Sequence, residues 1–333
     1  MPKRRIVDIR REVPLLDVAS YGRRSPGDHV PSKAEIAHIS RTVRRVPEVM
    51  VKVSGGARSV KGVAQHLDYI GREGRGEVQT DGGERLQGKG FERAILEDWD
   101  LDLEAHRRHT ERAIAAGRKP PKLVHNIVLS MPKSTPPEKV LRAVQIFARE
   151  KFALKHRYLM ALHVDQGHPH VHVVVKAVSE QGARLYIRPH SLREWRRDFA
   201  QYLRDLGVEA NATERAVRGE TRTTKSDGIH RAMLRGQSTH MRARAEAAVR
   251  EIASGGLKPD PGKRVLLETR RAVLNGWCGL ASTLERDGSP KLAGVVRRFA
   301  ESLPPPLTEK ERIASHLRGP VRDRRISAGA PTR

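Results

Sequence analysis

The chain has 333 residues, with 64 lysines and arginines against 39 aspartates and glutamates, which gives a formal net charge of +25. This excess favours a polyanionic partner, because each cationic side chain that neutralises a phosphate releases a condensed counterion. Nucleic acid is the leading candidate, and an anionic membrane surface is the second. The one cysteine, Cys278, excludes an intramolecular disulfide and a cysteine-based zinc finger, so histidines and carboxylates would have to hold any metal.

Residues 1–46 are basic and punctuated by proline, glycine and serine, which predicts a mobile extension. Residues 1–17 lack the apolar core and the cleavage site of a secretory signal, and no apolar run reaches the ~18 residues of a membrane span. We therefore expect a cytoplasmic protein that does not insert into a membrane.

Residues 47–228 mix strand and helix patterns, which predicts an α+β domain. The first strand, 47–56, has alternating valines and ends at a Gly-Gly pair. The next segment, 59–71, has apolar residues at helical spacing behind Ser59, a favourable helix cap. Further strands are predicted at 122–132, 158–165 and 168–179, and further helices at 91–117, with a break near 98–102, at 136–152 and at 191–207.

Beyond residue 228 the pattern becomes helical and strongly basic. It predicts a helical basic region at 229–316 and a disordered basic tail at 317–333. Apolar stripes mark three helical segments in this region, around 229–253, 264–275 and 290–301.

A histidine cluster, "HVDQGHPHVH" at 163–172, is the most specific local feature of the sequence. In a strand, residues two apart face the same way, so His170 and His172 share one face. His163 lies across a turn at Gln166–Gly167, where antiparallel pairing could bring it alongside them. The alternate residues Val171, Val173 and Val175 would then face the core.

Three imidazoles that leave coordination positions open predict a site for a divalent ion that acts as a Lewis acid. The candidates are Mg²⁺ or Mn²⁺, with Zn²⁺ as a further one. Asp165 and His168 would orient the ligands or neighbouring water. The alternative is that the histidines decorate a strand exposed to solvent.

Four segments together resemble the nuclease domain of plasmid relaxases, which are HUH endonucleases. They are "GGARSVKGVAQHLDYIGREG" at 55–74, "HNIVLSMP" at 125–132, "HVDQGHPHVHVVV" at 163–175 and "NATERAVRG" at 211–219. The resemblance covers about residues 47–220 and is closest to the relaxase type that nicks T-DNA borders. It implies an antiparallel central sheet with flanking helices, and the HUH motif is His170-Val171-His172.

The resemblance also implies an activity, which is site- and strand-specific nicking of single-stranded DNA at an origin of transfer. A tyrosine attacks a DNA phosphate, becomes linked to the 5′ end and leaves a free 3′ hydroxyl. The expected partners are origin DNA, accessory relaxosome proteins and the coupling protein of a type IV secretion system, through which the protein could be exported with its DNA.

Tyr69 matches the nucleophile of the relaxase motif. It lies beside His66 on the face of the predicted helix that is turned away from the apolar stripe. Asp165 is the second catalytic candidate, and it could act either on the phenol proton or on the ligand histidines. Conjugative relaxases place this tyrosine before the HUH histidines, whereas replication initiators place it after them. The other tyrosines are weaker candidates: Tyr21 in the extension, Tyr158 before a strand, Tyr186 in an apolar segment and Tyr202, the initiator-type alternative, on a helix packed against the core.

Two rival functions remain open at this point. A non-catalytic DNA-binding accessory protein would need the charge and a structural metal, but not Tyr69. A metal-dependent phosphohydrolase would cut DNA with activated water and would leave no covalent adduct.

Basic residues outside the histidine cluster are candidate DNA contacts. Arg58 and Lys61 lie next to the relaxase-like helix, and a strip at 215–225 carries Arg215, Arg218, Arg222 and Lys225. Aromatic residues form only 4% of the chain, so stacking platforms for DNA bases must be few, and Trp195 and Trp277 are expected in the core. The tail arginines Arg322, Arg324 and Arg325 resemble a type IV secretion signal.

Overall fold

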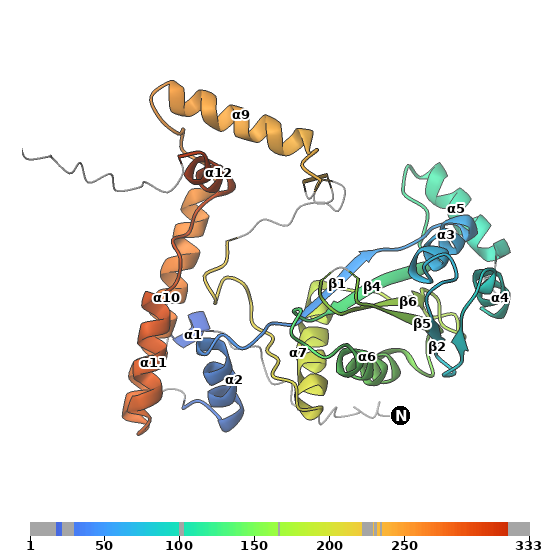
Figure 1. Ribbon diagram of the computed structural model, residues 1–333, viewed down its shortest axis with the longest axis horizontal. Helices are drawn as coiled ribbons and strands as arrows, with labels where there is room; N and C mark the ends of the chain where they lie inside the picture. The colour runs from blue at the N-terminus through green and yellow to red at the C-terminus, as the bar shows by residue number, and fades with distance from the viewer. Residues whose placement is uncertain are drawn as a thin grey trace, which may run out of the picture. The chain divides into compact units, whose positions relative to one another are not determined.

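The computed structural model describes residues 18–21, 30–99, 103–165, 167–221, 229, 232–233 and 235–318 (Figure 1). The chain divides into two compact units. The first is formed by Ile36–Thr213, and the second by the described parts of 17–35 and 214–333. Each unit has its own packed interior, so each is described separately.

The first unit is built on a six-stranded sheet in the order β1-β4-β6-β5-β2-β3. All neighbouring strands in this sheet pair antiparallel, which confirms the expected α+β fold with an antiparallel central sheet. The strands are β1 (Met50–Gly55), β2 (Val78–Thr80), β3 (Arg85–Leu86), β4 (Val124–Ser130), β5 (Tyr158–His163) and β6 (His170–Lys176). The short β2–β3 hairpin was not predicted, because its strands are too short to show a period.

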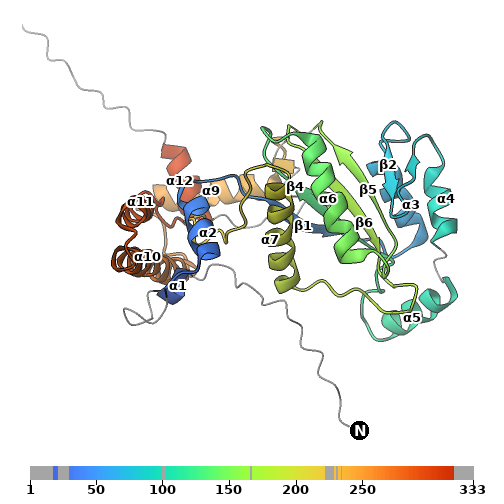
Figure 2. The same ribbon diagram turned by 90° about the horizontal axis from the view of Figure 1, so that it is seen from below.

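Helices cover both faces of this sheet, as the edge-on view in Figure 1 and the turned view in Figure 2 show. On one face lie α6 (Pro137–Phe152) and α7 (Pro189–Asp205), and on the other lie α3 (Val60–Ile70) and α4 (Phe91–Asp98). The break expected near 98–102 is confirmed, because α4 ends at Asp98 and α5 (Leu103–Ala115) begins at Leu103.

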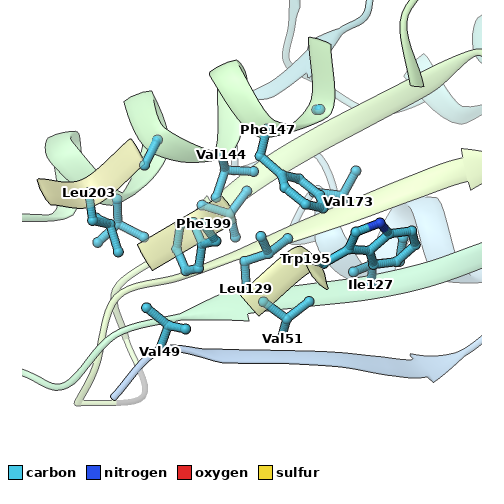
Figure 3. Close-up of a cluster of buried hydrophobic side chains, with 14 of the residues drawn as sticks. Val49, Val51, Ile127, Leu129, Val144, Phe147, Val173, Trp195, Phe199 and Leu203 are labelled. Atoms are coloured by element: carbon cyan, nitrogen blue, oxygen red, sulfur yellow. The ribbon is translucent and has the colours of Figure 1, made fainter. Parts of the chain in front are cut away.

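Each face of the sheet packs against its own apolar cluster. Figure 3 shows the cluster under α6 and α7, in which Trp195 and Phe199 meet Ile127, Leu129 and Val173 of the central strands. Val171, Val173 and Val175 all belong to this cluster, as their alternation in the sequence predicted. The opposite cluster joins Val63, Leu67 and Ile70 of α3 to Val124, Leu159 and Val174 of the sheet.

Helix α2 (Lys33–Val43) lies within the segment that was expected to be a mobile extension, so that expectation is wrong for this part of 1–46. Ile39 and Val43 are buried, which supplies the apolar contacts that an extension would lack. The side-chain amide of Asn211 also donates to the hydroxyl of Thr42 at 3.1 Å and to a carboxylate oxygen of Glu48 at 3.1 Å. These bonds tie the end of α2 to the segment that follows α7.

The second unit is helical, as predicted. It contains α1 (Val18–Tyr21), α9 (Thr239–Ala253), α10 (Lys263–Arg286), α11 (Pro290–Glu301) and α12 (Glu309–Arg318). Helix α10 continues well past the predicted end at residue 275. It packs against α1 at Gly276, where a Cβ atom would lie 2.0 Å from the carbonyl oxygen of Val18. Tyr21 is the last residue of α1 and is buried, which corrects its placement in an extension.

The boundary between the units lies earlier than the division expected at residue 228. Trp277 Nε1 donates to the carbonyl of Val217 at 3.0 Å, and Arg270 Nη2 donates to that of Gly219 at 2.9 Å. These two bonds hold the segment after Glu214 against α10, inside the helical unit. Trp277 and Trp195 are both buried, as expected. Among the described residues, no helix combines the length and apolar composition that crossing a bilayer requires.

The first unit should lose stability in mild acid because of two partly buried histidines. Burial lowers the pKa of His38 and His125 to about 4, with a further contribution from the charges of Arg41 and Lys122 respectively. An unfolded chain takes up these protons near pH 6.5, whereas the folded chain does not, so the free energy of unfolding falls as the pH drops from about 6.5 to 4. We expect His125→Gln to reduce that fall by about 1 to 2 kcal/mol between pH 7 and 5.

Urea unfolding of the metal-free protein at the two pH values measures this difference. The exposed His190 provides the control, because His190→Gln should leave the pH dependence unchanged. An equal fall in the wild type and in His125→Gln would contradict the assignment.

Candidate active site

The antiparallel pairing of β5 with β6 brings the three predicted ligand histidines together. His163 stands directly opposite His170 in the register, and His172 follows two residues along the same strand. One ring nitrogen from each lies within 4.8 Å of the others. The chain reverses between the strands at Gly167, whose φ of +74° suits glycine, whereas Gln166 lies outside the described residues.

Two main-chain carbonyls fix the ring nitrogens that can face a metal. The carbonyl oxygen of Ile70 lies 2.8 Å from His163 Nε2, and that of His168 lies 3.2 Å from His170 Nδ1. A carbonyl only accepts, so each of these nitrogens must carry the hydrogen, which leaves His163 Nδ1 and His170 Nε2 as lone-pair donors.

Buried ring nitrogens without partners support the same interpretation. Within the described part of the chain, no hydrogen bond reaches the buried His163 Nδ1 or the buried His172 Nδ1. Orphaned acceptors of this kind are costly unless another group satisfies them. Three imidazole nitrogens converging in this way fit a divalent cation with open positions.

The histidines are held in the neutral form that a metal requires. Burial is the main cause that lowers the pKa of His163 and of His170, and it lowers that of His172 to about 3, with the neighbouring imidazoles adding to the effect. The alternative, that these histidines decorate a strand exposed to solvent, is wrong for His163 and His170. His163 and His170 are each only 4% exposed, because this face of the sheet lies beneath α3.

Helix α3 places Tyr69 beside the histidines. The hydroxyl of Ser59 accepts from the backbone of Gly62 and so caps the helix, while the stripe Val63, Leu67 and Ile70 is buried against the sheet. The ring of Tyr69 is 46% exposed, and its centroid lies 6.2 Å from that of His172. The phenol is therefore accessible to a ligand and adjacent to the candidate metal centre.

The rival tyrosines of the first unit lie elsewhere. Tyr158 is buried in the cluster on the opposite face of the sheet, and Tyr202 packs against the same cluster and donates to Glu150 at 2.6 Å. Tyr186 is exposed, with 72% of its side chain accessible. Among the tyrosines that the structure describes, Tyr69 is therefore the one whose ring contacts a histidine of the triad.

Asp165 is paired with an arginine that sequence reasoning did not identify. Arg72 Nη2 donates to both carboxylate oxygens of Asp165, at 2.5 and 2.6 Å. The guanidinium carbon of Arg72 lies 6.0 Å from the centroid of the Tyr69 ring. Arg72 stands in the relaxase-like segment "QHLDYIGREG", but nothing in the sequence spacing indicates its contact with a residue 93 positions away.

Two other histidines complete the surroundings. His168 accepts at its main-chain carbonyl from His170 at 3.2 Å, and the centroids of the two rings are 5.3 Å apart. His66 was not predicted as a site residue, although its ring lies 6.2 Å from Tyr69 and 6.4 Å from His172. Burial lowers the pKa of His66, which favours its neutral form.

The predicted DNA contacts are divided between the two units. Lys61 is exposed on the first turn of α3, and the carbonyl of Arg58 accepts from His106 of α5 at 2.9 Å. The strip at 215–225 belongs to the second unit, where Arg215 is exposed and Arg218 pairs with Glu220 at 2.7 Å. Arg222, Lys225 and the tail arginines Arg322, Arg324 and Arg325 lie outside the described residues.

Comparison with known proteins finds similarity to relaxase nuclease domains. Residues 69–208 match the family model described as "Relaxase: MobA/VirD2-like, nuclease domain". The chain is 26% identical to the T-DNA border endonuclease VirD2 of Rhizobium radiobacter over 208 residues, which are 57% of this chain and 47% of that protein. It is 23% identical to the protein of the same name from Agrobacterium fabrum strain C58, over 59% of this chain and 46% of that one. The chain therefore spans about half the length of these curated relatives.

Metal binding by the triad can be tested through stability. An ion that binds only the folded protein stabilises it by about 2.7 kcal/mol at about 100 times its Kd. We expect Mn²⁺ to raise the unfolding temperature of the wild type but not that of the double variant His170→Gln/His172→Gln, in which the volume of the buried rings is largely kept. His190→Gln is the control, and an undiminished Mn²⁺ shift in the double variant would contradict the metal assignment.

Proposed function

We propose that this chain, whose residues 69–208 match the family model of MobA/VirD2-like relaxase nuclease domains, nicks single-stranded DNA by tyrosine transesterification. The observation that carries the proposal is the position of Tyr69. It is half-exposed, and its ring centroid lies 6.2 Å from that of His172. The substrate would be the origin of transfer of a plasmid, and the product a covalent intermediate for conjugative mobilisation. Accessory relaxosome proteins and a type IV coupling protein are the partners that this role would need.

The proposed reaction exchanges one phosphodiester for another. The Tyr69 hydroxyl oxygen attacks phosphorus and loses its proton, a bond forms between them, and the bond from phosphorus to the 3′ oxygen breaks. The released 3′ oxygen takes up a proton, and the 5′ end remains on the tyrosine. Because the phosphotyrosyl bond is again an ester, the energy of the broken bond is kept for religation.

The three histidines would hold the cation that this reaction requires. When bound to His163, His170 and His172, a divalent ion such as Mg²⁺ or Mn²⁺ would neutralise charge on the scissile phosphate. The carbonyls of Ile70 and His168 keep the ligand nitrogens aimed inward, and the burial of the rings keeps them neutral. Asp165 would act beside this centre through its contact with Arg72.

The order of the site residues along the chain supports a conjugative relaxase over a replication initiator. Tyr69 precedes the histidines, and the initiator-type candidate Tyr202 packs against the cluster on the opposite face of the sheet. Arg58 and Lys61 would contact the DNA near the start of α3. Arg215, Arg218, Arg222 and Lys225 would add phosphate contacts from the segment after Thr213.

Replacing Tyr69 by phenylalanine tests the reaction directly. The ring and its packing remain while the nucleophilic oxygen is removed, so we expect affinity for single-stranded DNA to stay within about twofold and adduct formation to be lost. The assay incubates the protein and Mn²⁺ with a single-stranded DNA pool that carries a randomised segment. Protein shifted by covalent DNA is then detected on a denaturing gel, and sequencing of the trapped strands reports the preferred site.

Tyr202→Phe is the matched control, and it should form the adduct as the wild type does. Adduct formation by Tyr69→Phe would contradict the assignment. Cut DNA without an adduct in the wild type would indicate a phosphohydrolase, and uncut DNA with any metal would indicate an accessory binding protein.

A further inference from the structure

The guanidinium of Arg72 is only partly used by its carboxylate partner. Both contacts to Asp165 come from Nη2, and within the described residues no hydrogen bond occupies Nε or Nη1. The Arg72 side chain is 28% exposed. The donors that remain therefore lie at an accessible position beside Tyr69.

The turn that carries Arg72 has a left-handed backbone that is unusual for its residues. Arg72 has a φ of +54° and Glu73 a φ of +57°, although neither is glycine. The turn is closed by bonds from Gly74 N and Gly76 N to the carbonyl of Gly71, at 3.0 and 2.9 Å. Strained conformations of this kind persist where the surroundings enforce them, and they concentrate at functional sites.

Contacts below the turn explain how it is enforced. A Cβ atom at Gly71 would lie 2.4 Å from the Phe91 ring at the start of α4, so the chain can approach α4 closely only because this residue is glycine. This close approach fixes the position of the next residue, Arg72. Its side chain turns back over Tyr69 to reach Asp165 at the end of β5.

Stability alone does not account for the Arg72–Asp165 pair. The two side chains are 28% and 55% exposed, and ion pairs with that exposure contribute little to folding. The arrangement has a chemical use instead. A guanidinium carries five N–H donors in one plane, so a carboxylate can hold one nitrogen while a donor on another nitrogen binds a second oxyanion.

We propose that Arg72 binds a DNA phosphate next to the one attacked by Tyr69, and that Asp165 is the positioning residue that aims its guanidinium. This rests on the proposed function for the identity of the anion. Arg72 contributes an N–H donor, from Nε or Nη1, to a phosphate oxygen, and no covalent step passes through it.

Binding measurements test the phosphate contact without requiring any cleavage. The probe is a labelled thymidine oligonucleotide of about 20 nucleotides, whose affinity is measured by anisotropy over a range of salt concentrations. We expect Arg72→Gln to weaken binding and to reduce the magnitude of the log–log salt slope by about 0.7, the loss of one phosphate contact to a single strand. Arg75 in the same turn provides the control. Its side chain is 78% exposed and pairs with Glu73, and its Nε donates to the main-chain carbonyl of Arg72 at 3.2 Å. Among the described residues it pairs with neither Tyr69 nor Asp165, so Arg75→Gln should change neither quantity.

A second measurement tests the role of Asp165. With a strand recovered from the randomised pool, we expect Arg72→Gln to slow adduct formation by about 10- to 100-fold, as expected for losing a hydrogen bond to a charged group. Arg72→Lys should restore part of the rate. Asp165→Asn should slow the wild type but add little to Arg72→Gln, because a positioning residue has no effect once its partner is gone.

The outcomes separate this inference from the proposed function. An unchanged salt slope in Arg72→Gln, or equal losses in Arg72→Gln and Arg75→Gln, would overturn the phosphate site whether or not the protein nicks DNA. Additive effects of Arg72→Gln and Asp165→Asn would overturn the positioning role. A reduced slope in a protein that forms no adduct would leave the phosphate site in place and refute the nicking reaction. Thermal unfolding of each variant verifies that it is folded.

Discussion

The pairing register of β5 and β6 is the constraint on which the rest of the site depends. It sets His163 opposite His170 and leaves His172 on the same face. A shift of the β5–β6 register by one residue would turn the side chains of one strand to the other face of the sheet, and the three histidines would no longer lie together. The register is secured from behind, because Val171, Val173 and Val175 must fill the core beneath α6 and α7. The valines of β6 thus fix the positions of the histidines on the opposite face of the same strand.

Helix α3 couples Tyr69, the proposed nucleophile, to that register. Its apolar stripe packs on the face of the sheet that carries the histidines, and its last carbonyl, at Ile70, accepts from His163. Tyr69 stands immediately before Ile70, and Arg72 stands two residues after it. Residues 69–72 therefore determine the tautomer of His163, the position of the Tyr69 phenol and the direction of the Arg72 guanidinium. A displacement of α3 would disturb all three.

Periodic patterns made much of this predictable. The period of two in "HPHVHVVV" indicated the shared face of His170 and His172, and helical spacing placed Tyr69 opposite the buried stripe. The burial of the imidazoles and the helix at 33–43 were not predicted, because they depend on which distant surfaces come to cover them. Arg72 was missed for the same reason, because its partner is 93 residues away. The direction of its side chain is also set by a left-handed turn that the residue types do not predict.

The most direct test of the account locates the DNA on the protein. Adducts formed with the trapped strand would be digested with trypsin and nuclease, and the residual nucleotide would be mapped by mass spectrometry. We expect it on the phenolic oxygen of Tyr69, in the peptide "GVAQHLDYIGR". A nucleotide attached to Tyr202 would contradict the account and would assign the chain a nucleophile of the replication-initiator type.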